Sequence, residues 1–179
     1  MKETMCAFLR GINVNGKNMK MTDICEVFRQ ESVDNVRSVL ATGNILFDSS
    51  LSKSELKSKL EHAISRRYQS EESIFIKDQI EIDAILKGVP FTTESSFHIY
   101  VFICEIGFES ILLERFRSIT PATNEKALIH ANQFYWQVSK GETLDSGFSK
   151  ILADKKLRSR FTSRNINTIQ KIHEKMRVV

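Results

Sequence analysis

A glycine-rich segment near the N-terminus has the residue types that bind phosphate groups. Gly11, Gly16 and Lys17 show the G-x-x-x-x-G-K spacing of a P-loop, and the apolar residues 4–10 before them predict a strand. Backbone N–H groups of such a loop, its lysine and the start of a following helix attract anions. Asn18 stands where a P-loop has the Ser or Thr that holds Mg²⁺. The segment therefore predicts an anion site and not a nucleoside triphosphatase.

A predicted hairpin turn contributes polar residues to the same site. Residues 36–40 and 45–47 are expected strands, and residues 41–44 between them are typical of a tight turn. In a β-α-β-β-α-β unit this turn and the exit loop of the first strand lie at one end of the sheet. We call this end, residues 10–18 with 41–44, the rim. Its predicted ligand-binding residues are Arg10, Asn13, Lys17, Asn18, Thr42, Gly43 and Asn44. The alternative is that the asparagines bond the backbone of their own loops and only hold the loop shape.

A third polar segment, residues 162–165, reads as the start of a helix capped by its hydroxyl side chains. Arg164 would then lie beside exposed N–H groups, where a cation is unfavourable unless a carboxylate or a bound anion is present. We therefore add Arg164 and Asn165 to the predicted ligand-binding residues. We also predict that Arg10, Lys17 and Arg164 form one electropositive site.

Residue types for catalysis and metal binding are scattered along the chain. The four histidines fall on different predicted elements and form no H-x-x-x-H pair, so no metal site is predicted. The three cysteines are odd in number and widely spaced, which excludes a disulfide framework and a zinc knuckle. No Ser or Cys occupies a nucleophile elbow. The sequence predicts no cofactor, and enzyme activity stays open.

Hydrophobic periodicity predicts an α+β fold of two similar ferredoxin-like units, each a split βαβ with an antiparallel sheet. The first unit is residues 1–78, with spatial strand order 4-1-3-2. Its strands are expected at 4–10, 36–40, 45–47 and 74–76, and its helices at 24–28, with Thr22 or Asp23 as cap, and at 52–68. The second unit is residues 79–179, which include a connecting helix and a terminal helix. Its helices are expected at 80–86, 108–116, 148–157 and 165–176, and its strands at 97–104, 127–130 and 134–138, with a stub at 160–161.

Three of these motifs resemble those of a known family. They are similar to signatures of the bacterial domain of unknown function family 1697. The three motifs are R-G-I-N-V at residues 10–14 with G-K-N at 16–18, G-N at 43–44, and T-S-R-N-I-N-T at 162–168. The resemblance covers essentially the whole chain. It implies an α+β fold of ferredoxin-like halves and carries no assigned activity. The sequence departs from the family pattern at Asn15, Thr42 and Ser163, where Gly, Ser and Thr are usual.

Charge is concentrated near the C-terminus. Residues 150–179 hold nine basic and two acidic side chains, whereas residues 1–149 hold 17 basic and 20 acidic, for a net charge of +4 overall. A basic segment attracts phosphates, so the alternative function is a nucleic-acid-binding module. The aromatic residues 134–136 could stack on bases, although aromatic residues at alternate strand positions are more typical of a core. A second alternative is an enzyme acting on a phosphorylated substrate, which would need a general base from outside the rim.

Composition places the chain among globular proteins, with 41% hydrophobic and 27% charged residues. No apolar run approaches the roughly 18 residues of a membrane helix, and the N-terminus shows no signal-peptide pattern. We expect a soluble, cytoplasmic protein that binds a small anionic ligand. The sequence leaves the oligomeric state open.

Overall fold

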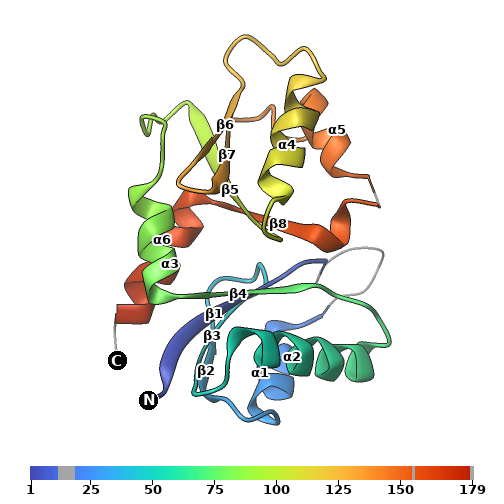
Figure 1. Cartoon of the computed structure of the whole chain (residues 1–179), viewed down its shortest axis with the longest axis vertical. Helices are drawn as coiled ribbons and strands as arrows, with labels where there is room; N and C mark the ends of the chain where they lie inside the picture. The colour runs from blue at the N-terminus through green and yellow to red at the C-terminus, as the bar shows by residue number, and fades with distance from the viewer. Residues whose placement is uncertain (12–18, 155, 178–179) are drawn as a thin grey trace. The chain divides into compact units, whose positions relative to one another are not determined.

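The computed structural model describes residues 1–11, 19–154 and 156–177, and the chain divides into two compact units (Figure 1). One unit comprises residues 1–82 with 171–179, and the other comprises residues 83–170. The division falls inside two helices, and the domain boundary after residue 78 stays a prediction.

The first unit contains a four-stranded antiparallel sheet with the strand order β2-β3-β1-β4. Its elements are β1 (Glu3–Leu9), α1 (Met21–Arg29), β2 (Asp34–Ser38), β3 (Asn44–Ser49), α2 (Lys53–Tyr68) and β4 (Ile74–Asp78). The predicted split βαβ and its spatial order 4-1-3-2 are confirmed. The predicted cap of α1 is wrong, because the helix begins before Thr22 and Asp23, and Lys20 stands at its N-cap.

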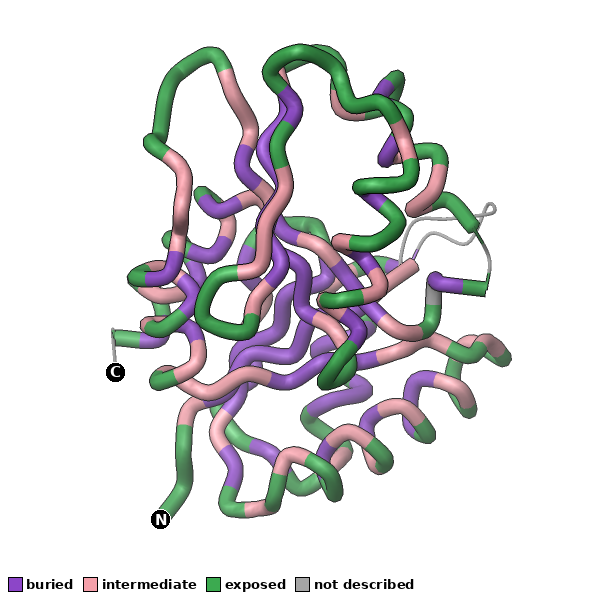
Figure 2. The backbone as a smooth tube through the Cα atoms, turned by 45° about the horizontal axis from the view of Figure 1, so that its top comes forward, coloured by how far each residue is buried: buried purple, intermediate pink, exposed green. Residues whose placement is uncertain are grey.

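Strand β1 is buried on both faces, as its continuous apolar sequence predicts. Met5, Ala7 and Leu9 join the core cluster that α1 and α2 cover, and Cys6 and Phe8 on the opposite face are also fully buried. Successive side chains of a strand point to opposite faces, so an apolar residue at every position requires cover on both. Figure 2 shows β1 as a buried stretch, whereas α2 alternates between buried and exposed residues.

The second unit repeats the architecture, with the antiparallel strand order β6-β7-β5-β8. The remaining elements of the chain are α3 (Gln79–Lys87), β5 (Phe97–Cys104), α4 (Phe108–Arg117), β6 (Lys126–His130), β7 (Gln133–Ser139), α5 (Gly147–Leu152), a 3-10 turn (Arg158–Arg160), β8 (Phe161–Asn165) and α6 (Ile166–Arg177). A fold of two ferredoxin-like units with a C-terminal helix is therefore confirmed.

Two expected boundaries in this unit are wrong. Helix α5 ends at Leu152 and not at residue 157. Residues 161–165 form strand β8 and not a helix start, because their backbone pairs with β5, with Arg164 opposite Val101. Asn165 takes the capping role at α6, since its Oδ1 accepts a hydrogen bond from the backbone N–H of Asn167 at 2.9 Å.

The aromatic residues of β7 lie in the core of the second unit. Phe134 and Trp136 are buried against Phe148 of α5, and the Trp136 Nε1–H donates to Glu125 at 2.9 Å. The interpretation of residues 134–136 as core is confirmed. Because these rings are covered, they form no base-stacking surface.

No helix in the described part of the chain combines the length and the apolar character needed to span a membrane.

Candidate functional site

At the rim the structure brings together the end of β1, the turn 41–44 and the start of β4. The Leu9 N–H donates to the Gly43 carbonyl at 2.8 Å, and the Arg10 N–H donates to the Ser73 carbonyl at 3.3 Å. Gly11 and Gly43 both have positive φ, of 81° and 75°, which a residue with a side chain rarely adopts. The half-buried Arg10 therefore stands at the meeting point of three chain segments.

The side chain of Asn44 stabilises the turn. It is fully buried, and its Nδ2 donates to the Val39 carbonyl and to the Thr42 hydroxyl, both at 2.9 Å. This matches the structural alternative for Asn44 and Thr42, because their polar atoms are engaged within the turn. A ligand-binding role for Thr42, Gly43 and Asn44 stays a prediction.

Three of the predicted rim residues, Asn13, Lys17 and Asn18, lie outside the described residues. Their predicted roles rest on the sequence alone.

Two buried hydroxyl groups, which sequence reasoning missed, lie at the same end of the first sheet. Helix α2 ends at Tyr68, and the chain then leads through Ser70 into β4, whose first residue, Ile74, pairs with Leu9 of β1 (Figure 1). In the part of the chain that the structure describes, neither the Tyr68 nor the Ser70 hydroxyl has a hydrogen-bond partner. Burial, and secondarily the charge of Asp23, raises the pKa of the Tyr68 hydroxyl, which therefore stays a proton donor.

The start of α1 adds electropositive backbone to this region. The N-cap residue is Lys20, whose ammonium cannot accept a hydrogen bond from the first N–H groups of the helix. The Thr22 hydroxyl donates to Asp23 at 3.2 Å. Helix starts without a side-chain cap bind anions through their exposed N–H groups.

Arg164 and Asn165 belong to the second unit and have protein partners there. Arg164 is only 8% exposed, and its guanidinium donates to the Thr162 hydroxyl at 2.7 Å and to the Ser163 carbonyl at 2.8 Å. The Asn165 Nδ2 lies 3.1 Å from the His98 Nδ1. A site that Arg164 shares with Arg10 and Lys17 stays a prediction.

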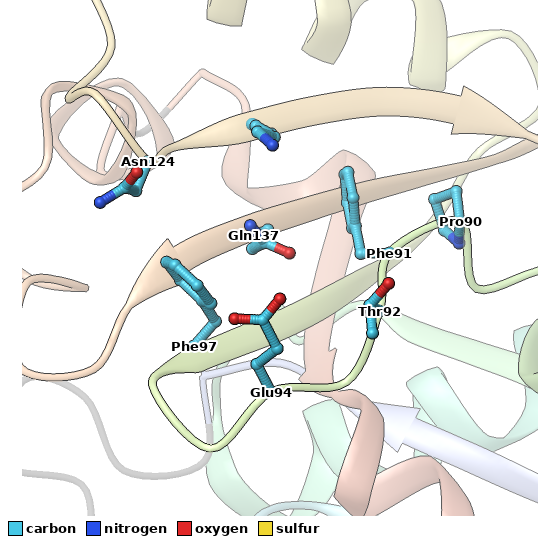
Figure 3. Close-up of a pocket in the computed structure, with 8 residues that line it drawn as sticks. Pro90, Phe91, Thr92, Glu94, Phe97, Asn124 and Gln137 are labelled. Atoms are coloured by element: carbon cyan, nitrogen blue, oxygen red, sulfur yellow. The ribbon is translucent and has the colours of Figure 1, made fainter.

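The second unit contains two pockets beside the segment that leads from α3 to β5. The larger has a volume of about 450 Å³ (Figure 3), and the smaller, of about 150 Å³, reaches Asn165 and Asn167. Glu94 and Phe97 line both pockets. Residues 90–96 form neither helix nor strand, so hydrophobic periodicity does not indicate them as part of a site.

Hydrogen bonds anchor the α3 end of this segment on β6 and β7. The Tyr135 hydroxyl donates to the Ile85 carbonyl at 2.8 Å, and the His130 Nδ1 donates to the Gly88 carbonyl at 2.8 Å. At the other end the Lys140 N–H donates to the Ser96 carbonyl at 2.9 Å. Burial raises the pKa of Tyr135 to about 12, so its hydroxyl remains a donor over the physiological range.

Side chains for metal binding are dispersed. Within residues 1–11, 19–154 and 156–177, no three His, Cys, Asp or Glu side chains gather in a way that could hold a metal ion. Cys6 and Cys25 are buried, Cys104 is half-buried, and no disulfide joins any of the three.

Comparison with known proteins places the chain in a family. A search of curated proteins found no match. Among solved structures, the conserved bacterial protein SP0830 from Streptococcus pneumoniae is similar, with a TM-score of 0.79 and 21% identity over 99% of this chain and 100% of that one. A proposed transcriptional repressor of the glycine cleavage system has a TM-score of 0.23 at 12% identity, over 92% of this chain and 96% of that one, a likeness too low to support an argument. The model of the proteins of unknown function DUF1697 matches residues 1–135, and the chain belongs to this family.

Proposed function

We propose that the protein binds a small anionic or phosphorylated ligand at the rim. The observation that supports this proposal best is the pair of buried hydroxyls, Tyr68 and Ser70, at the end of the sheet where Arg10 stands. Buried polar groups are nearly always hydrogen-bonded in folded proteins, so two buried donors at the same end of the sheet as a cation suggest a ligand with several acceptor atoms. A phosphate group has that chemistry.

Each group at the rim would contribute differently to binding a phosphate. A guanidinium such as that of Arg10 forms charge-assisted, bidentate hydrogen bonds to phosphate oxygens. The hydroxyls of Tyr68 and Ser70 are neutral donors, and the start of α1 offers backbone N–H groups. The loop residues Asn13, Lys17 and Asn18, which lie outside the described residues, would add further donors by their residue types.

A thermal-shift experiment with inorganic phosphate and a phosphate monoester tests the proposal. A ligand at 100 times its Kd stabilises the folded state by about 2.7 kcal/mol, which raises the melting temperature by several degrees in a protein of this size. We expect Arg10→Ala to abolish this rise, and Tyr68→Phe to reduce it, because each removes a donor to the anion. The far-UV circular dichroism spectrum should stay unchanged in both variants.

Arg117→Ala is the matched control, since Arg117 is an exposed arginine on α4 of the second unit. It should keep the full phosphate response. If wild-type protein shows no phosphate-dependent rise, or if Arg10→Ala responds as the wild type does, the rim is only a structural feature.

The two alternatives stay predictions of the sequence. Nothing in the described geometry favours an enzyme over a binding protein, and the nucleic-acid alternative rests on the charge of residues 150–179.

A further inference from the structure

A glutamine, Gln137, lines the larger pocket of the second unit. Gln137 lies near the end of β7, where its backbone pairs with Ile99 of β5 and Lys126 of β6. The residue as a whole is only 7% exposed, and it lines the pocket. The amide of a residue held in this position by two neighbouring strands can donate and accept hydrogen bonds to a ligand in the pocket.

Aromatic rings and a carboxylate surround this amide. Figure 3 shows Gln137 between the rings of Phe91 and Phe97, with the Glu94 carboxylate turned toward the same space. The ladder position of Lys126, directly opposite Gln137, places a cation at the pocket. The pocket therefore combines a fixed amide, apolar ring surfaces and one charge of each sign.

The donor and acceptor pattern of the amide identifies the class of ligand. A glutamine side chain presents one N–H₂ donor and one C=O acceptor in a plane, and it forms paired hydrogen bonds with the edge of a nucleobase. Aromatic side chains such as Phe91 and Phe97 offer their faces to the same flat heterocycle. A carboxylate such as Glu94 accepts hydrogen bonds from an exocyclic amino group or from ribose hydroxyls. The volume of about 450 Å³ lies within the range of small-molecule sites.

We propose that this pocket binds the base of a nucleoside or nucleotide, with Gln137 as the residue that reads the edge of the base. Lys126 then favours a 5′-phosphate over the bare nucleoside. This site is separate from the rim, because its residues belong to the second unit and the rim belongs to the first.

Titration calorimetry of the full chain with adenosine, guanosine, cytidine and uridine tests the proposal. Uncharged nucleosides are the probes because a phosphate could also bind at the rim. We expect at least one nucleoside to bind with a Kd below 1 mM, and Gln137→Leu to weaken this binding at least tenfold. Gln137→Glu, which replaces the N–H₂ donor by an acceptor, should change which base binds best.

Gln133→Leu is the matched control, since Gln133 lies on the same strand at the hairpin end and outside the pocket lining. It should bind as the wild type does, and so should Arg10→Ala, which separates this site from the rim. If Gln137→Leu fails to fold, Phe91→Ala in the connecting segment tests the same pocket. Absence of binding by all four nucleosides, or equal binding by the Gln137 and Gln133 variants, would overturn the proposal.

Discussion

At the scale of single residues, the end of α3 depends on a close approach at Gly88. A Cβ atom added to Gly88 would lie 2.9 Å from the Tyr135 hydroxyl and 3.0 Å from the Ala84 carbonyl oxygen. Neither atom moves easily, because Tyr135 is buried and bonded to Ile85 and the carbonyl belongs to the helix backbone. We expect Gly88→Ala to lower the free energy of unfolding by about 1–3 kcal/mol, measured by chemical denaturation.

Gly147→Ala is the control for this residue-scale prediction. The nearest atom to a Cβ there is the mobile end of Ile119 at 3.3 Å, and the residue is helical, so this variant should be neutral or slightly stabilised. Tyr135→Phe in the Gly88→Ala background should recover part of the loss, because it removes the hydroxyl that the new methyl group meets. Equal stability of Gly88→Ala and wild type would contradict the close approach.

At the scale of elements, the start of α3 is held by a reciprocal cap and an ion-pair cluster. The Glu81 N–H donates to the Asp78 side chain at 2.9 Å, the Asp78 N–H donates to the Glu81 side chain at 3.0 Å, and Lys53 of α2 contacts both carboxylates. Burial tends to raise the pKa of both carboxyls, but the hydrogen bonds, led by the one from Lys53, lower each pKa below its ordinary value.

This cap predicts a specific loss of stability in acid. A carboxyl whose pKa is lowered by folding stabilises the protein above its unfolded pKa, and this contribution is lost as pH falls through the folded pKa. We expect Glu81→Gln to cost about 0.5–2 kcal/mol at neutral pH, as loss of a cap does. The difference from wild type should shrink as the pH falls below the ordinary pKa of a glutamate and through the lowered folded pKa of Glu81, and it should vanish once Glu81 is protonated in both states. Urea denaturation at several pH values measures it, with Glu114→Gln on the exposed side of α4 as control. A difference that does not change with pH would exclude this role.

At the scale of the whole molecule, the uneven charge makes the basic residues 150–179 the segment to test for nucleic-acid binding. Lys156 and Lys171 are exposed cations within the basic residues 150–179. We expect the pair Lys156→Glu and Lys171→Glu to reduce retention on immobilised RNA or DNA at low salt and to lower the salt dependence of binding. Each phosphate contact contributes a slope of about −0.9 in log K against log salt for duplex DNA.

The pair Arg115→Glu and Arg117→Glu on α4 changes the net charge by the same amount and is the control. Equal losses in both pairs would mean that only total charge matters. No retention of wild type at low salt would remove the nucleic-acid alternative and leave the segment as a solvated surface.

Local sequence patterns predicted most of the elements, and non-local pairing accounts for the error at residues 161–165. The capping box of Ser52 and Glu55 at α2 was readable, because both partners lie within one helical turn. Hydroxyl residues before an apolar periodic segment are typical of a helix N-cap, so the local pattern predicts a helix start at residues 162–165. In the structure, residues 161–165 form a strand. Their state depends on pairing with β5, about sixty residues earlier in the chain.

The sequence by itself determined the order of the elements, the antiparallel sheet of each unit and the meeting of the end of β1 with the turn 41–44. These follow from periodicity and from the topology of a split βαβ. Only the tertiary structure decided which polar groups already have partners. It showed that Asn44 is engaged in its own turn, that the hydroxyls of Tyr68 and Ser70 are buried, and that Gln137 faces a pocket. The physical reason is that burial and hydrogen bonding depend on every segment that packs around an atom, and no local pattern records those segments.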